Sequence, residues 1–125
     1  MIGNRYLSEL YKTVDEDTAF NQVMEMIISN DTDFIKSLNI PVDLSECESE
    51  ELIFLTKIAA ILDYYLQMAG RVVPQWLRDE RLSFELPYYH SRRISDFEKL
   101  RLIYTCPAPF RARNAYFDLD ALVRI

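Results

Sequence analysis

The stretch of sequence that decides the fold is Ser49–Ala69, SEELIFLTKIAAILDYYLQMA. Acidic side chains fill its first turn, and Gly70 follows it where a helix commonly ends in a left-handed cap. The pattern predicts one long helix that begins at Ser45 or at Ser49, because Ser45 and Glu48 match a capping box. Its polar positions form a single narrow stripe: Thr56, Lys57, Ala60, Asp63, Tyr64 and Gln67. Because the rest of its circumference is apolar, neighbouring segments must cover it on most sides.

Shorter helices are expected before this central helix. Helical spacing of apolar residues predicts a first helix at about 6–14 and a second one that Asp15 or Asp17 caps. The second helix has an amphipathic face of Phe20, Val23, Met24, Ile27 and Ile28. A third helix is expected from Thr32 to Leu38, because Pro41 cannot continue it.

After Gly70 the pattern changes. Pro74 suits the first turn of a short helix, and Ser95 with Glu98 forms a second capping box before a helix that Pro107 ends. One face of that helix carries Phe97, Leu100, Ile103 and Tyr104. A short extended piece is expected at Ala115 to Phe117, followed by a helical turn capped by Asp118. The predicted fold is all-α (mostly), a compact multi-helix bundle around the central helix at about 49–69, with an irregular, short-strand-containing C-terminal segment.

Size and charge favour a single domain, 1–125, made of a helical half (1–70) and an Arg/aromatic-rich C-terminal module (71–125). Half of the 125 residues are apolar, which is enough for a core, and two glycines are too few for the turns of an all-β fold. The net charge of −6 is unevenly spread, since residues 1–62 hold 12 acids and 4 bases while residues 63–125 hold 8 acids and 10 bases. An acidic chain is a poor general binder of nucleic acid.

Other features predict a cytoplasmic location. The two cysteines, Cys47 and Cys106, form no CxxC pair, which is typical of ordinary thiols in a reducing compartment. The first residues lack the apolar core of a secretion signal, and Lys57 and Asp63 interrupt the most apolar stretch. We therefore expect no membrane association.

The sequence matches no known catalytic or ligand-binding motif. The single histidine, His90, excludes a two-histidine metal site, and nothing in the sequence orients it toward Cys106 as a nucleophile–base pair. The acidic cluster at Asp31 lacks the glycine and the glutamate of a calcium loop, and Asp118 with Asp120 is better explained by helix capping. Phosphate-binding glycine loops are absent from the sequence. The expectation is a protein with no catalytic residue, no metal and no cofactor.

The one concentrated signal is the segment from Trp76 to Tyr116, in which aromatic residues alternate with arginines. These residue types dominate binding hot spots, so the segment predicts a surface for another protein or for a second copy of the chain. Two alternatives remain open. The aromatics are core with arginines stacked on them, or the protein is a nucleic-acid-binding regulator that uses its basic C-terminal half, with rings stacked on single-stranded bases. The candidate partner-binding residues are Trp76, Arg78, Arg81, Tyr88, Tyr89, Arg92, Arg93, Phe110, Arg111, Arg113, Asn114 and Tyr116.

Some residues between Phe110 and Asn114 suit a structural role and not a binding role. Phe110 can fill the core, and Asn114 can adopt a left-handed turn while it bonds to backbone. Arg111 and Arg113 lie two residues apart, so in an extended segment they share one side, from which one of them can clamp the acid-rich half.

About residues 74–125 also carry a set of motif positions: Pro74, Trp76, Leu77, Asp79, Arg81, Pro87, Tyr88, Tyr89, Pro107, Phe110, Arg113, Asn114, Tyr116, Asp118 and Leu122. In this order they resemble the C-terminal PxWL…PxxFxxRN-aromatic-D module of an uncharacterised bacterial family. Ala115 departs from it, because the family has an aliphatic–aromatic pair after the asparagine. The family often accompanies nucleotidyltransferase-like or toxin–antitoxin-type proteins. The resemblance thus implies a non-enzymatic interaction module, the antitoxin-like or regulatory member of a two-protein system, and it supplies no catalytic residue.

Overall fold

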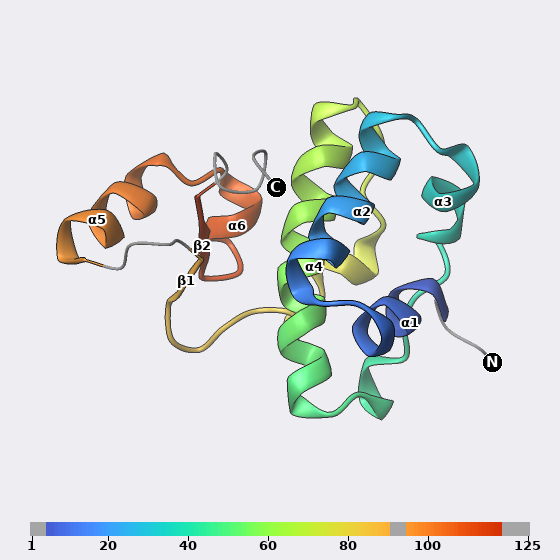
Figure 1. Ribbon diagram of the computed structural model, residues 1–125, viewed down its shortest axis with the longest axis horizontal. Coiled ribbons are helices and arrows are strands. Elements are labelled where there is room, and N and C mark those ends of the chain that lie inside the picture. Colours follow the sequence, from blue (N-terminus) through green and yellow to red (C-terminus); the bar gives the residue numbers. More distant parts are fainter. Residues whose placement is uncertain (1–4, 91–94, 119–125) are drawn as a thin grey trace.

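The computed structural model describes residues 5–90 and 95–118 and places one long helix, α4 (Ser49–Met68), at the centre of the molecule. In Figure 1, α4 runs the full height of the body, with α1, α2 and α3 on one side and β1, α5, α6 and β2 on the other. The elements in chain order are α1 (Arg5–Thr13), α2 (Glu16–Ile28), α3 (Thr32–Ser37), the 3-10 turn η1 (Leu44–Glu46), α4, the 3-10 turn η2 (Gln75–Arg78), β1 (Tyr88–His90), α5 (Asp96–Thr105), α6 (Ala108–Arg111) and β2 (Ala115–Phe117). The mostly helical fold expected from the sequence is confirmed.

Several predicted helix ends are confirmed because their signals are local. The Asp15 side chain accepts a hydrogen bond from the Thr18 N–H (3.3 Å), and the Ser95 side chain accepts one from the Glu98 N–H (3.1 Å). At the end of α4, Gly70 has a φ of 71°, and the N–H groups of Gly70 and Arg71 close back onto the carbonyls of Gln67 and Leu66. This is the double hydrogen bond of a Schellman cap.

The predicted capping box of Ser45 and Glu48 is wrong. Ser45 lies in η1, where both its N–H and its hydroxyl donate to the Asp43 carboxylate, at 3.1 and 2.6 Å. Glu48 is instead the N-cap of α4, and its side chain makes no capping hydrogen bond. The prediction fails because the Asp43 carboxylate accepts hydrogen bonds from both the N–H and the hydroxyl of Ser45, and these bonds hold Ser45 in η1.

The core surrounds the middle of α4 on all sides. Every residue from Phe54 to Asp63 is buried, and one cluster of buried side chains includes residues from α1, α2, α4, α6 and β2. Most of the polar stripe of α4 is covered as well, although Gln67 at its end is exposed. Thr56 donates to the Leu52 carbonyl at 2.7 Å, and the buried Lys57 ammonium pairs with Glu16 of α2 at 2.7 Å. Both halves of the chain therefore share a single core.

A small parallel sheet forms in the C-terminal part. β1 pairs with β2 in the register Tyr88↔Ala115, Tyr89↔Tyr116 and His90↔Phe117, and α5 and α6 make the crossover between them. The expected extended piece at Ala115–Phe117 is thus confirmed, and its partner lies in the stretch expected to be irregular. The predicted helical turn after Asp118 lies outside the described residues. Within 5–90 and 95–118, no helix has the length and apolar character to cross a membrane.

Candidate interaction surface and the Asp63 cluster

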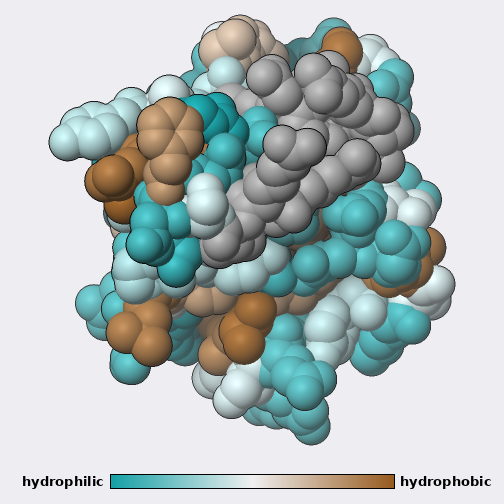
Figure 2. Space-filling view, turned by 60° about the vertical axis from the view of Figure 1, so that its left-hand side comes forward, coloured by the Kyte–Doolittle hydropathy of each residue, from teal (hydrophilic) through white to brown (hydrophobic). Residues whose placement is uncertain are grey.

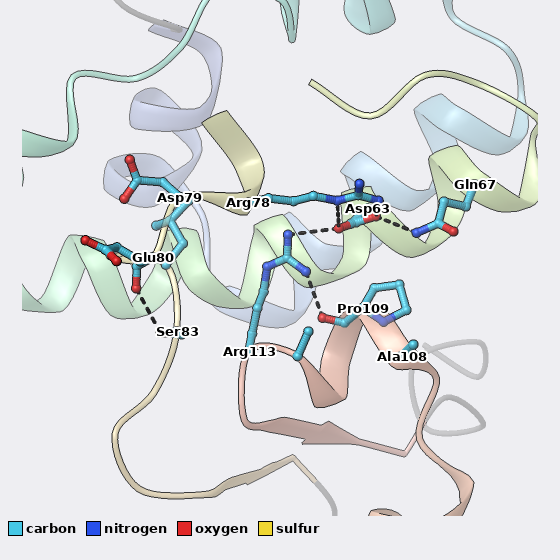
Figure 3. A pocket seen from close by; sticks show the side chains of 11 residues that line it. Asp63, Gln67, Arg78, Asp79, Glu80, Ser83, Ala108, Pro109 and Arg113 are labelled. Carbon is cyan, nitrogen blue, oxygen red and sulfur yellow. Dashed lines mark hydrogen bonds and ion pairs between the residues drawn. The ribbon is translucent and has the colours of Figure 1, made fainter. Parts of the chain in front are cut away.

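Asp63 of α4 is buried and holds two arginines of the C-terminal module. Its two oxygens accept hydrogen bonds from Nε and Nη2 of Arg78, both at 2.9 Å, and Nη2 of Arg113 donates to it at 3.0 Å. Gln67, one turn further along α4, donates at 2.7 Å. Figure 3 shows these side chains converging from α4, from η2 and from the turn after α6. We call Asp63, Gln67, Arg78 and Arg113 the Asp63 cluster.

The electrostatics of the Asp63 cluster make it a clamp rather than an acid–base pair. Burial alone raises the pKa of Asp63, but the hydrogen bonds from Arg78, Gln67 and Arg113 outweigh it and hold the pKa below its usual value. Burial lowers the pKa of Arg113, and the Asp63 carboxylate opposes that shift. A carboxylate that accepts four hydrogen bonds from its own protein stays ionised near neutral pH, and its acceptor positions are already used.

Among the described partner-binding arginines, Arg113 is the most deeply buried, with 4% of its surface exposed. Besides Asp63, it donates to the Pro109 carbonyl and to the Leu77 carbonyl, each at 2.7 Å. One arginine was expected to clamp the acid-rich half, residues 1–62. Arg113 does clamp an acid, but the acid is Asp63, just beyond that half, and Arg113 reaches it from a turn and not from an extended segment. Charge reversal at Arg113 would place a second carboxylate against Asp63, so this residue cannot serve as a probe of partner binding.

The other polar candidates bond mainly to the protein itself. Trp76 Nε1 donates to the Leu38 carbonyl at 2.7 Å, and Arg111 donates to the Cys106 carbonyl at 2.7 Å. Arg81 forms a two-pronged pair with the Asp79 carboxylate at 3.0 Å for each nitrogen. Asn114 has a φ of 58°, and its Nδ2 donates to the Phe84 carbonyl at 3.2 Å. Arg92 and Arg93 lie outside the described residues.

The aromatic candidates are mostly core or partly buried. Phe110 is fully buried, as expected, and Tyr88 is half-buried with its hydroxyl 2.9 Å from Nδ1 of His90. Tyr89 and Tyr116 stack on each other across the two strands, with ring centroids 5.4 Å apart. The cations above these rings are lysines, Lys57 over Tyr88 and Lys99 over Tyr89.

His90 and Cys106 do not form a catalytic pair. His90 stacks on Phe117 at 4.6 Å between ring centroids, and burial lowers its pKa, although Asp17 and Glu16 pull in the opposite direction. Burial also raises the pKa of the Cys106 thiol, whose Sγ–H donates to the Ala115 carbonyl at 3.7 Å. Neither side chain is poised for nucleophilic chemistry, because the thiol is protonated at neutral pH and nothing joins it to the imidazole.

Most of the apolar face predicted for α5 points outward, although one of its four residues, Ile103, is partly buried. Leu102 is the buried residue of this helix, whereas Phe97, Leu100 and Tyr104 are 76%, 56% and 81% exposed. We call these three residues the α5 outer face. In Figure 1, α5 stands away from the main body, and Figure 2, which turns this side of the molecule forward, shows separate brown hydrophobic side chains among teal hydrophilic ones. The spacing in the sequence revealed the stripe but not the direction in which it points.

Comparison of the chain with protein-family models, curated proteins and solved structures gives no match. Within the described residues, no group of three or more His, Cys, Asp or Glu side chains could hold a metal ion. The function must therefore be argued from the geometry.

Proposed function

We propose that this protein is a non-enzymatic interaction domain that binds another protein through the α5 outer face. The observation that carries the proposal is an exposed apolar stripe, Phe97, Leu100 and Tyr104, on a helix that stands away from the body. Residues at positions i, i+3 and i+7 are the anchors that an amphipathic helix inserts into a partner's hydrophobic groove. Isolated apolar residues on a surface need no explanation, but a stripe at helical spacing on an outward face favours binding.

The charged side chains of α5 leave this stripe free. Arg101 pairs with Glu98 on its own helix and with Asp118 at 3.3 Å, so its guanidinium is held toward β2. Lys99 lies over the Tyr89 ring, 5.3 Å from its centroid. Because these cations are engaged on the inner side, a partner would desolvate few charges when it covers the outer face.

The sequence resemblance suggests what kind of partner to seek. It favours the antitoxin-like or regulatory member of a bacterial two-protein system, whose partner would be a toxin or a nucleotidyltransferase-like protein. The described arginines of the segment donate to this protein's own acids and carbonyls, so no observation favours the nucleic-acid alternative.

The test is affinity capture from the native host followed by reconstitution with the purified partner. We expect wild type and the control Val72→Glu, at a position that is 90% exposed and distant in sequence, to capture one stoichiometric protein. Leu100→Glu should weaken the reconstituted complex by about 30-fold or more, the magnitude of a hot-spot loss of about 2 kcal/mol.

Two outcomes would contradict the proposal. Equal affinity of all three purified proteins for the partner would show that the α5 outer face is not the contact surface. A wild-type chain that captures no stoichiometric protein under native conditions would argue against an interaction domain altogether. Thermal melting of each variant separates lost binding from lost folding.

A further inference from the structure

A cavity of about 330 Å³ lies where the end of α1 and the start of α2 meet the first half of α4. In Figure 1, α1 lies beside the lower part of α4, and the chain turns directly from α1 into α2. A volume of this size is at the lower end of the range that small-molecule sites occupy. The residues that line the cavity are Tyr11, Val14, Glu16, Glu50, Ile53 and Phe54.

Four of these six side chains are aromatic or aliphatic. The rings of Tyr11 and Phe54 are in contact, with centroids 5.3 Å apart and planes inclined at 50°. Val14 is half-buried and Ile53 is 44% exposed, so aliphatic surface is also accessible there. A strongly hydrated cation, such as a primary ammonium or a metal ion, gains little from such walls because it loses water without replacing it. An ion that spreads its charge over methyl groups loses much less.

The other two lining residues are acids, and the described lining includes no lysine, arginine or histidine. The Glu16 carboxylate is neutralised by the buried Lys57 ammonium, 2.7 Å away. The Glu50 carboxylate is exposed, and no cation in the described part of the chain pairs with it. When Lys57 is counted, the cavity therefore keeps a net negative charge, which Glu50 supplies.

The Tyr11 side chain shows that negative charge acts on the cavity itself. Partial burial raises the pKa of its hydroxyl, and the carboxylates of Glu50, Glu51 and Glu48 raise it further. No described cation opposes these carboxylates at Tyr11. The face of an aromatic ring also attracts cations, so the ring and the carboxylates favour the same sign of charge in a ligand.

We propose that this cavity binds a small organic cation that carries a quaternary ammonium group. The methyl groups of the ligand lie against the rings of Tyr11 and Phe54, and the Glu50 carboxylate faces its positive charge. A quaternary ammonium group has no N–H donor, so apolar walls leave none of its hydrogen bonds unmade. The lining residues all belong to the helical half and not to the α5 outer face, so this proposal stands or fails separately from the proposed function.

The test is a titration with choline, followed by NMR of the methyl groups of Val14 and Ile53. We expect saturable shifts with a dissociation constant on the order of 1 mM at low ionic strength, as suits a ligand of so few atoms. The matched control ligand is the neutral tert-butyl analogue of choline, in which a carbon atom replaces the nitrogen. It has the same shape without the charge and should bind about tenfold more weakly or worse.

Variants at Glu50 test the charge without endangering the fold, because this side chain is exposed. Glu50→Gln should weaken choline binding about threefold, and Glu50→Lys should weaken it about tenfold or more. The control Glu46→Gln removes an exposed acid that is not part of the described lining, and it should leave choline binding unchanged. Thermal melting checks that each variant is folded.

The role of the aromatic ring has its own variant. Tyr11→Leu keeps an apolar wall but removes the ring, so it should weaken the binding of choline more than that of the neutral analogue. The proposal is overturned if choline gives no saturable shift, if the neutral analogue binds equally well, or if Glu50→Lys binds choline like wild type. Equal weakening of both ligands in Tyr11→Leu would likewise contradict it.

Discussion

Asp63 shows how much of this molecule depends on one side chain. Its carboxylate joins α4 to η2 through Arg78 and to the turn after α6 through Arg113. The sequence revealed the arginines as a concentrated pattern, but it could not tell that they serve as internal clamps. Their acid is 50 residues away from Arg113, and a linear pattern carries no information about which distant charges meet.

Asp63→Asn is expected to lower the free energy of unfolding at pH 7 by about 3 kcal/mol, because it leaves the Arg113 guanidinium buried without a counter-charge. Urea unfolding measures this loss. The ion pair of Asp79 with Arg81 offers the matched control. Asp79→Asn should lower the free energy of unfolding clearly less, since the Arg81 side chain remains solvated.

The stability of wild type and of Asp63→Asn should also depend differently on pH. The pKa of Asp63 in the folded protein lies below its usual value of about 3.9, so its stabilising contribution is complete above that pH and disappears as the pH falls through the folded-state pKa. Wild type should therefore lose more stability than Asp63→Asn when the pH is lowered below about 4. Parallel loss in both proteins would show that Asp63 is not the titrating group.

Among the elements, the helix ends separate what the sequence can predict from what it cannot. The caps at Asp15, Ser95 and Gly70 were predictable because each depends on neighbours within a few residues. The same local logic failed at Ser45, where Asp43 is an equally close competitor. For α5 the spacing defined a stripe and no direction, because the position of β2 decides which side of the helix is buried.

Glu48→Ser is expected to stabilise the protein by about 0.5 to 1 kcal/mol. Glu48 has the extended backbone of an N-cap, with φ −76° and ψ 166°, but its side chain makes no capping bond, and serine can supply one. Chemical denaturation gives the difference. The converse change at α5, Ser95→Ala, should destabilise by about 1 kcal/mol, because it removes a cap that is present. If Glu48→Ser does not raise the free energy of unfolding, the N–H groups in the first turn of α4 do not lack hydrogen-bond partners.

On the scale of the whole molecule, the central helix and the mostly helical class were predictable, and the parallel pairing of β1 with β2 was not. Ten consecutive buried residues on α4, from Phe54 to Asp63, leave a strong local signature. The two strands have three residues each and meet only after α5 and α6 have crossed between them. Their pairing depends on long-range packing against the core, which short segments do not encode.

The fragment 71–125 is expected not to fold by itself, even though it has the composition of a distinct module. Phe110 and Phe117 are buried in the core that α4 supplies, and Arg113 would lose its counter-charge. Circular dichroism and amide NMR dispersion of the isolated fragment test this expectation. Mixing it with the fragment 1–70 should restore helical signal; a fragment 71–125 that is folded alone would instead divide the chain into two domains.

The distance between Asp63 and Arg113 along the chain also has a consequence during synthesis. A ribosome adds about 5–20 residues per second, so α4 leaves the exit tunnel several seconds before the arginine that clamps it. During that interval the nascent chain exposes a helix that is apolar on nearly every side, together with an unpaired carboxylate. Until the segment that carries Arg113 has been synthesised, the nascent chain is therefore prone to aggregation.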